Sequence, residues 1–178
     1  MLRILLCIAM LCWPTVGYGN NAGKENLVKA VVLYNFAKFT DWPEETFTGP
    51  AAPIFFSATG KDMSETLFKL EGKQVKKRDV KLRHFDTNPQ YYSHILFISS
   101  SEGKSAAKIL SGIDNKPILT VSDIPGFIHQ GGMIGLIKKD GRIRFEINFD
   151  ATRKAGLRIS SQLLLLATTV IRDQVEVR

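Results

Sequence analysis

The chain has 178 residues, of which 44% are hydrophobic and 23% are charged. This balance is typical of one folded domain and excludes bulk disorder. The formal net charge of +7 favours partners with acidic surfaces, anionic lipid headgroups or nucleic acid.

The first residues have the pattern of a secretory leader. Arg3 precedes an almost continuous apolar run over 4–16, and the small residues Gly17 and Gly19 follow it. This order of a positive charge, an apolar core and small residues is that of a signal peptide. The run is also too short for the roughly 20 apolar residues that span a bilayer. We therefore predict a cleaved signal peptide over 1–19.

Cleavage there leaves one domain over 20–178 in the periplasm. Both cysteines, Cys7 and Cys12, lie in the leader, so the mature chain has no thiol for a disulfide, a zinc site or a nucleophile. Loss of Arg3 leaves a net charge of +6. Export makes nucleic acid a poor partner, and acidic proteins or lipid headgroups stay open.

A helix is expected over 23–40. Val28, Val32, Phe36 and Phe39 recur at spacings of four, four and three, which places them on one helical face. Pro43 ends the pattern, because proline disfavours a helical residue before it. Trp42 at this end either fills the core or lies at an interface.

Alternating strands and short helices follow. In chain order the pattern predicts a strand over 53–58, a helix carrying Met63, Leu67 and Leu70 with Asp62 or Ser64 as its cap, strands over 80–85 and 95–98, a helix over 105–110 and a strand over 118–121. The twofold order of strand, helix and strand indicates parallel crossover units.

The pattern then changes to a hairpin and a final helix. Strands over 133–137 and 143–147 flank Asp140-Gly141, a strong hairpin signal because both turn residues need positive φ. A helix begins near Asp150, and the apolar run 163–166 indicates burial on more than one face. The predicted fold is a single α/β domain with a mixed central sheet, flanking helices, a hairpin near the C-terminal end and a long C-terminal helix.

Three stretches carry a resemblance to a known family. They are KAVVLYNFAKFTDWP over 29–43, PILTVSDIPGF over 117–127 continuing into GGMI over 131–134, and RFEIN over 144–148 followed by AGLRISSQLL over 155–164. In this order and spacing they resemble the YfiR family of periplasmic repressors, and the resemblance covers nearly all of residues 27–172.

The resemblance implies a periplasmic regulator without catalytic activity or cofactor. Relatives bind the periplasmic sensing domain of an inner-membrane diguanylate cyclase and hold it inactive, which lowers cyclic-di-GMP and so affects biofilm formation. It also implies an outer-membrane lipoprotein that sequesters the repressor, and a possible homodimer. Several relatives carry cysteines where this chain has Ser57 and Ser93, so redox control by a disulfide is not expected here.

Five residues are candidates for partner binding: Phe127, Arg144, Asn148, Arg153 and Arg158. Phe127, in a glycine-rich loop, is either an exposed aromatic anchor or a core residue. Arg144 on a strand, with Arg153 and Arg158 on the last helix, suits bidentate recognition of carboxylates or phosphates, or else local pairing. Asn148 at a strand end is either a turn cap or a contact.

Two other functional classes have requirements that can be compared with the sequence. A small-ligand sensor acting with a histidine kinase or cyclase would need polar groups converging in an apolar pocket. A hydrolase would need a nucleophile beside a base, and no such motif is present. His84, His94 and His129 lie far apart in sequence, so no metal site is predicted.

Overall fold

The computed structural model describes residues 21–85 and 93–177, and the predicted leader over 1–19 lies outside them. The first half contains α1 (Asn21–Lys38), β1 (Thr40–Asp41), η1 (Glu44–Thr46), β2 (Ile54–Ala58), α2 (Lys61–Leu67), η2 (Phe68–Leu70), β3 (Gln74–Val75), β4 (Arg78–Leu82) and β5 (Ile95–Ile98). The second half contains η4 (Ser100–Glu102), α3 (Ala106–Gly112), β6 (Leu119–Ser122), η5 (Phe127–Gln130), β7 (Ile134–Lys139), β8 (Arg142–Asn148), α4 (Phe149–Lys154), β9 (Arg158–Ile159), α5 (Ser161–Leu166), β10 (Thr169–Arg172) and β11 (Val175–Val177).

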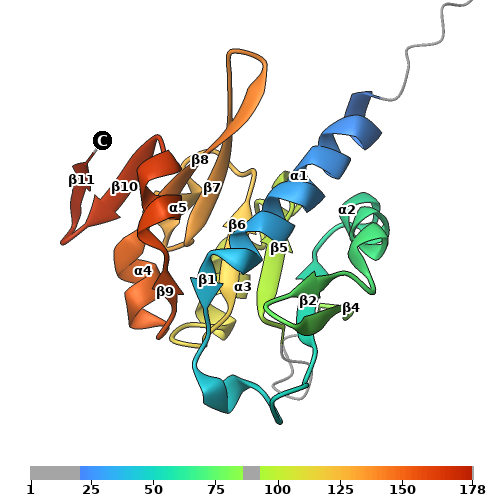
Figure 1. Cartoon of the computed structure of the whole chain (residues 1–178). Helices are drawn as coiled ribbons and strands as arrows, with labels where there is room; N and C mark the ends of the chain where they lie inside the picture. Colours follow the sequence, from blue (N-terminus) through green and yellow to red (C-terminus); the bar gives the residue numbers. More distant parts are fainter. Residues whose placement is uncertain (1–20, 86–92, 178) are drawn as a thin grey trace, which may run out of the picture.

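A nine-stranded mixed sheet in the order β11-β10-β8-β7-β6-β5-β2-β4-β3 forms the centre, which confirms the predicted α/β class (Figure 1). Strands β4, β2, β5, β6 and β7 are mutually parallel. Their spatial order corresponds to 2-1-3-4-5 along the chain, the order of a doubly wound sheet. β8 pairs antiparallel to β7, and β1 and β9 form a separate two-stranded ribbon. No described helix is long and apolar enough to span a bilayer.

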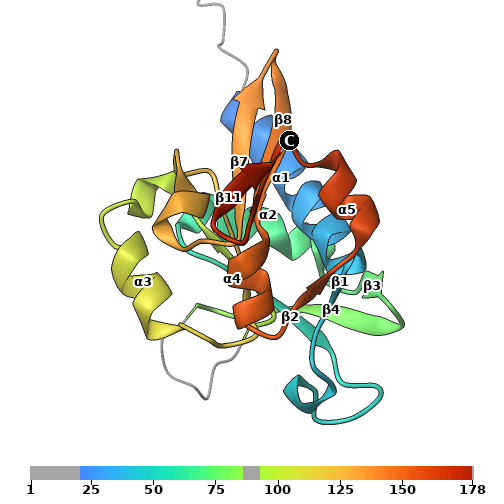
Figure 2. The ribbon, with the colours of Figure 1, turned by 90° about the vertical axis from the view of Figure 1, so that its left-hand side faces the viewer.

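The two faces of the sheet are covered by different helices. Side chains of α1, α2 and α5 pack into the larger core on one face, and those of α3 and η5 pack into a smaller core on the other. Figure 2 shows these two layers on opposite sides of the strands. Trp42 belongs to the larger core and is 8% exposed, so it fills the core rather than an interface.

Helix α1 is confirmed, but its buried face is displaced from the predicted one. Ala30, Leu33, Phe36 and Ala37 are buried, whereas Val28 is exposed. Lys29 is also buried on this helix, which the apolar pattern does not reveal.

Lys29 joins α1 to the carboxyl end of β6. Its ammonium lies 2.7 Å from Asp123 Oδ2 and 2.9 Å from Glu25 Oε1. The other Asp123 oxygen, Oδ1, accepts a hydrogen bond from the Ser100 backbone N at 2.7 Å. Burial alone would lower the pKa of Lys29, but the hydrogen bonds to Asp123 and Glu25 outweigh it and raise that pKa.

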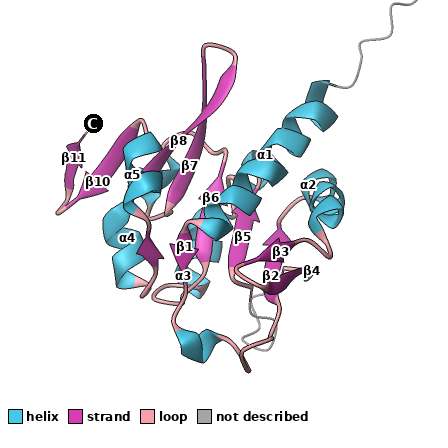
Figure 3. Cartoon of the chain, viewed as in Figure 1, coloured by secondary structure: helices cyan, strands magenta, loops and turns pink. Residues whose placement is uncertain are grey.

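The hairpin is confirmed: Asp140 and Gly141 have φ of 51° and 70° between β7 and β8. The prediction of a long C-terminal helix is wrong. Figure 3 shows two short helices, α4 and α5, separated by β9 and followed by the β10–β11 hairpin. α4 ends because Gly156 has a φ of 74°, and a new helix starts where the Ser160 side chain accepts from Gln162 N.

The expected caps also differ. Asn148, not Asp150, caps α4, and Gly60 precedes α2 without a side-chain cap. The apolar run 163–166 is not buried on every side, since Leu165 is 85% exposed.

Ser57 on β2 and Ser93 before β5 are buried and their hydroxyl oxygens are hydrogen-bonded to each other. Ser57 also donates to the Arg83 backbone O at 2.8 Å. The two positions that resemble cysteine positions of relatives are therefore neighbours in space. A polar contact joins them in this chain.

This geometry predicts that the double variant Ser57→Cys/Ser93→Cys forms a disulfide under oxidising conditions. Closing this loop should raise the free energy of unfolding by about 2–4 kcal/mol relative to the same variant reduced. Denaturant unfolding with and without reductant measures the difference. Free thiols persisting after oxidation would contradict the adjacency of the two positions.

Candidate functional site

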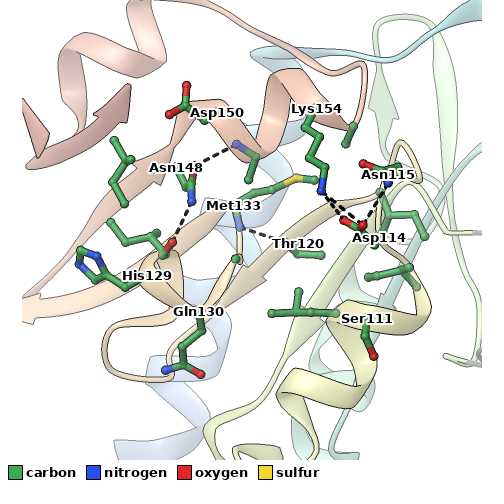
Figure 4. A pocket seen from close by; sticks show the side chains of 18 of the residues that line it. Ser111, Asp114, Asn115, Thr120, His129, Gln130, Met133, Asn148, Asp150 and Lys154 are labelled. Atoms are coloured by element: carbon green, nitrogen blue, oxygen red, sulfur yellow. Dashed lines mark hydrogen bonds and ion pairs between the residues drawn. The ribbon is translucent and has the colours of Figure 1, made fainter. Parts of the chain in front are cut away.

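A pocket of about 750 Å³ lies between α3 and α4 (Figure 4). It exists because the crossover from β6 to β7 contains only the single turn η5, which is too short to cover the sheet beside α3. Ile118, Ile128 and Met133 form apolar parts of its lining, and the β10–β11 hairpin adds Ile171 and Gln174.

Polar groups gather on two sides of this pocket. On one side, Lys154 of α4 lies 3.2 Å from Asp114 Oδ1, and Asn115 donates to the same carboxylate at 3.0 Å. Between the two sides, the buried Thr120 hydroxyl accepts from Met133 N at 3.0 Å. The arrangement can hold a small molecule with an apolar body and polar substituents.

Asn148 lies on the other side and joins two walls. Its Oδ1 accepts from Ala151 N at 2.9 Å, and its Nδ2 donates to the Ile128 backbone O at 2.8 Å. The first bond caps α4 and the second holds η5 against it. Of its two predicted roles, the structure shows the cap, and it adds the link to η5 that sequence did not reveal.

Asp150 connects the pocket wall to the last hairpin. Its two carboxylate oxygens accept from the backbone N atoms of Asp173 and Gln174 at 3.1 and 2.9 Å. Both turn residues have positive φ, 51° and 62°, although neither is glycine. The hydrogen bonds from Gln174 and Asp173 lower the pKa of Asp150, so this carboxylate is ionised at neutral pH.

Of the two alternatives for Phe127, the structure shows the core residue and not the exposed anchor. Its side chain is 1% exposed and belongs to the smaller core. Gly132 makes room for it, because a Cβ at this position would overlap the Phe127 ring. The glycines of this loop therefore serve packing as well as turning.

The predicted arginines are all exposed but lie on different elements: Arg144 on β8, Arg153 on α4 and Arg158 on β9. The placement of Arg158 on the last helix is wrong, because β9 is a strand paired with β1. No hydrogen bond or ion pair joins any two of the three within the described residues. Arg153 lies over the Phe149 ring at 5.9 Å.

Sequence reasoning missed a group of exposed apolar side chains at the end of the chain. Leu165 and Leu166 at the end of α5 are 85% and 66% exposed, and Val175 and Val177 of β11 are 59% and 47% exposed. α5 and β11 lie on either side of β10 (Figure 1). Arg153 and Arg172 both lie over the Phe149 ring. We use the name C-terminal surface for the exposed side chains that α4, β9, α5, β10 and β11 carry: Arg153, Arg158, Leu165, Leu166, Arg172, Val175 and Val177.

The model of the YfiR/HmsC-like family matches residues 26–168. The chain belongs to the YfiR/HmsC-like family. No curated protein matches the chain closely enough to count as a relative. Members of the YfiR family are periplasmic regulators of the diguanylate cyclase pathway. The match begins at residue 26 within α1, includes α2 to α5 and ends one residue before β10.

Within residues 21–85 and 93–177, no group of three or more His, Cys, Asp or Glu side chains could hold a metal ion. What the site offers is a pocket and an exposed surface.

The fit of Phe127 beneath Gly132 gives a stability prediction. Gly132→Ala should lower the free energy of unfolding by about 1–3 kcal/mol, because the buried ring must move. Gly112→Ala is the matched control, since an added Cβ meets open space there, and it should leave stability unchanged or raise it by up to about 1 kcal/mol. Equal denaturation midpoints for the two variants would contradict the packing described.

Proposed function

We propose that this protein is exported to the periplasm, binds the periplasmic domain of an inner-membrane diguanylate cyclase and holds it inactive, which lowers cyclic-di-GMP. Family membership supports the pathway. The observation that supports a protein partner is the C-terminal surface, where large apolar side chains are exposed. Exposed apolar groups of this size mark interaction sites when they gather.

The composition of this surface fits a protein interface. Leu165 and Leu166 supply an apolar centre, and burying each would contribute on the order of 1–3 kcal/mol. Arg153, Arg158 and Arg172 supply planar guanidinium groups that bind carboxylates with two hydrogen bonds. The partner surface that complements them is apolar at its centre and acidic around it.

Inhibition requires that the repressor bind the inactive cyclase more tightly than the active one. Moving a cyclase from 99% active to 1% active requires an affinity difference of about 10⁴-fold between the two states. An outer-membrane lipoprotein that covers the same surface would release the cyclase by competition. A homodimer through this surface would compete in the same way.

Substitutions that introduce a negative charge test the C-terminal surface. Leu165→Asp and Arg153→Glu should each weaken binding to the cyclase's periplasmic domain at least tenfold. The first removes an apolar contact, and the second removes a guanidinium that would bind a carboxylate of the partner. Both side chains are exposed, so the thermal unfolding temperature should stay within a few degrees of the wild type. Calorimetry measures the affinity.

Lys139→Glu is the matched control for Arg153→Glu. It makes the same change from a positive to a negative side chain on the exposed β7–β8 hairpin, away from the C-terminal surface. Unchanged affinity in both test variants, or an equal loss in the control, would overturn the assignment of the surface. Cyclic-di-GMP should rise in cells that lack the protein. Expression of the wild type or of Lys139→Glu should lower it again, whereas expression of Leu165→Asp or Arg153→Glu should not.

The pocket favours a second candidate function, a periplasmic small-ligand sensor acting with a cyclase or histidine kinase. It combines an apolar lining with Asp114, Lys154 and Asn148. A ligand at 100 times its dissociation constant should stabilise the protein by about 2.7 kcal/mol. A thermal-shift screen of small polar metabolites measures this.

Ala107→Trp provides the control for the ligand screen, since Ala107 is exposed and lines the pocket. The larger side chain should abolish the ligand-induced shift and leave the ligand-free unfolding temperature unchanged. A shift that persists in this variant would place the ligand elsewhere.

A further inference from the structure

Five side chains form a continuous stack at the side of the sheet that carries β2 and β4. Arg78 Cζ lies 3.7 Å from the centroid of the Phe47 ring, which stacks on His94 at 4.5 Å. His94 in turn stacks on Phe55 at 6.1 Å, and Arg83 Cζ lies 3.6 Å from the Phe55 centroid. His94 is thus the middle layer between two aromatic rings, each covered by a guanidinium.

His94 joins Trp42, at the start of the segment 42–53, to Phe55 of β2 through three bonds, and its ring stacks on Phe47 within that segment. Its Nδ1 accepts from Phe55 N at 3.1 Å, and its backbone N donates to Phe55 O at 2.9 Å. Its backbone O accepts from Trp42 Nε1 at 3.2 Å. Because Nδ1 is an acceptor, the neutral imidazole is the form that fits. A proton on Nδ1 would face the N–H of Phe55.

The groups around the ring disfavour a positive charge. His94 is 2% exposed, Arg78 of β4 and Arg83 lie beyond the rings, and Glu44 of η1 lies 3.5 Å from Arg78. Burial, then the charges of Arg78 and Arg83, lower the pKa of His94 to about 3, although a backbone hydrogen bond with Thr46 acts the other way.

We propose that His94 is an acid-sensitive latch, which holds the segment 42–53 against β2 and β5 at neutral pH and releases it on protonation. The pKa of His94 is lower in the closed state than the value of 6.5 in the open one. The latch is therefore fully effective above pH 6.5 and weakens as the pH falls from 6.5 towards 3. Each pH unit favours opening about tenfold, so pH 5 favours it about 30-fold.

The latch lies beside the C-terminal surface. Asp41, next to Trp42, pairs with Arg158 in the β1–β9 ribbon, and a Cβ on Gly156 would contact Pro43 at 3.4 Å. Release of the segment would loosen this ribbon and displace Arg158. That consequence, weaker cyclase binding at acidic pH, rests on the proposed function, whereas the latch itself does not.

Tryptophan fluorescence of the mature protein tests the latch without any partner. The sequence has two tryptophans, Trp13 in the predicted leader and Trp42 at the latch. Between pH 7.5 and 4, the Trp42 emission should shift to longer wavelength in the wild type. His84→Gln and His129→Gln, which replace the other two histidines, should keep this transition. His94→Gln should lose it.

Hydrogen exchange separates local release from general unfolding. On acidification, amides over 43–52 should exchange at least tenfold faster, whereas those of β5 and β6 should keep their protection. Equal acceleration everywhere, or a fluorescence transition that survives in His94→Gln, would overturn the latch.

If His94→Gln does not fold, two measurements on folded protein decide. The His94 ring signal in NMR should not titrate near pH 6.5, and Phe47→Leu should move the fluorescence transition to higher pH by weakening the stack. Ordinary titration of His94, or an unmoved transition, would overturn the proposal. Loss of cyclase binding without these changes would count against the proposed function instead.

Discussion

Every other element depends on the burial of β5 on both of its faces. Ile95 and Phe97 point into the larger core, and Leu96 and Ile98 point into the smaller one. A strand buried on both sides needs helices on both sides and parallel neighbours joined by crossovers. This requirement places α1 and α2 on one face and α3 on the other. The short β6–β7 crossover leaves part of the sheet beside α3 uncovered, and this uncovered area becomes the pocket.

The central strands and the hairpin were predictable because their signals are local. The apolar run 95–98 and the Asp140-Gly141 turn each determine one element without help from distant residues. The prediction of one long C-terminal helix was wrong because it gave the apolar run 163–166 more weight than three local signals. Gly156 supplied a left-handed C-cap, Ser160 an N-cap, and the β-branched run 168–171 a strand.

The candidate site was less predictable, because exposure is a property of packing. The sequence left Phe127 open between a loop anchor and a core residue, and its burial depends on Gly132, whose lack of a side chain gives room to the ring. Leu165 looked like core and is exposed, because α5 is only six residues long and buries one side through Leu163. Arg153 and Arg158 are exposed. The elements that lie beside these two arginines are known only from the three-dimensional arrangement.

The limits of the family match divide the C-terminal surface into two parts. The match ends at residue 168, so it includes Arg153, Arg158 and the apolar end of α5, but not the β10–β11 hairpin. The first part is where a binding mode shared within the family would lie. Val175 and Val177 lie outside the match, on β11 at the edge of the sheet. Under the proposed function, this hairpin is where discrimination among related partners would lie. Asp150 holds the hairpin through its turn and also lines the pocket, so one carboxylate joins the two features.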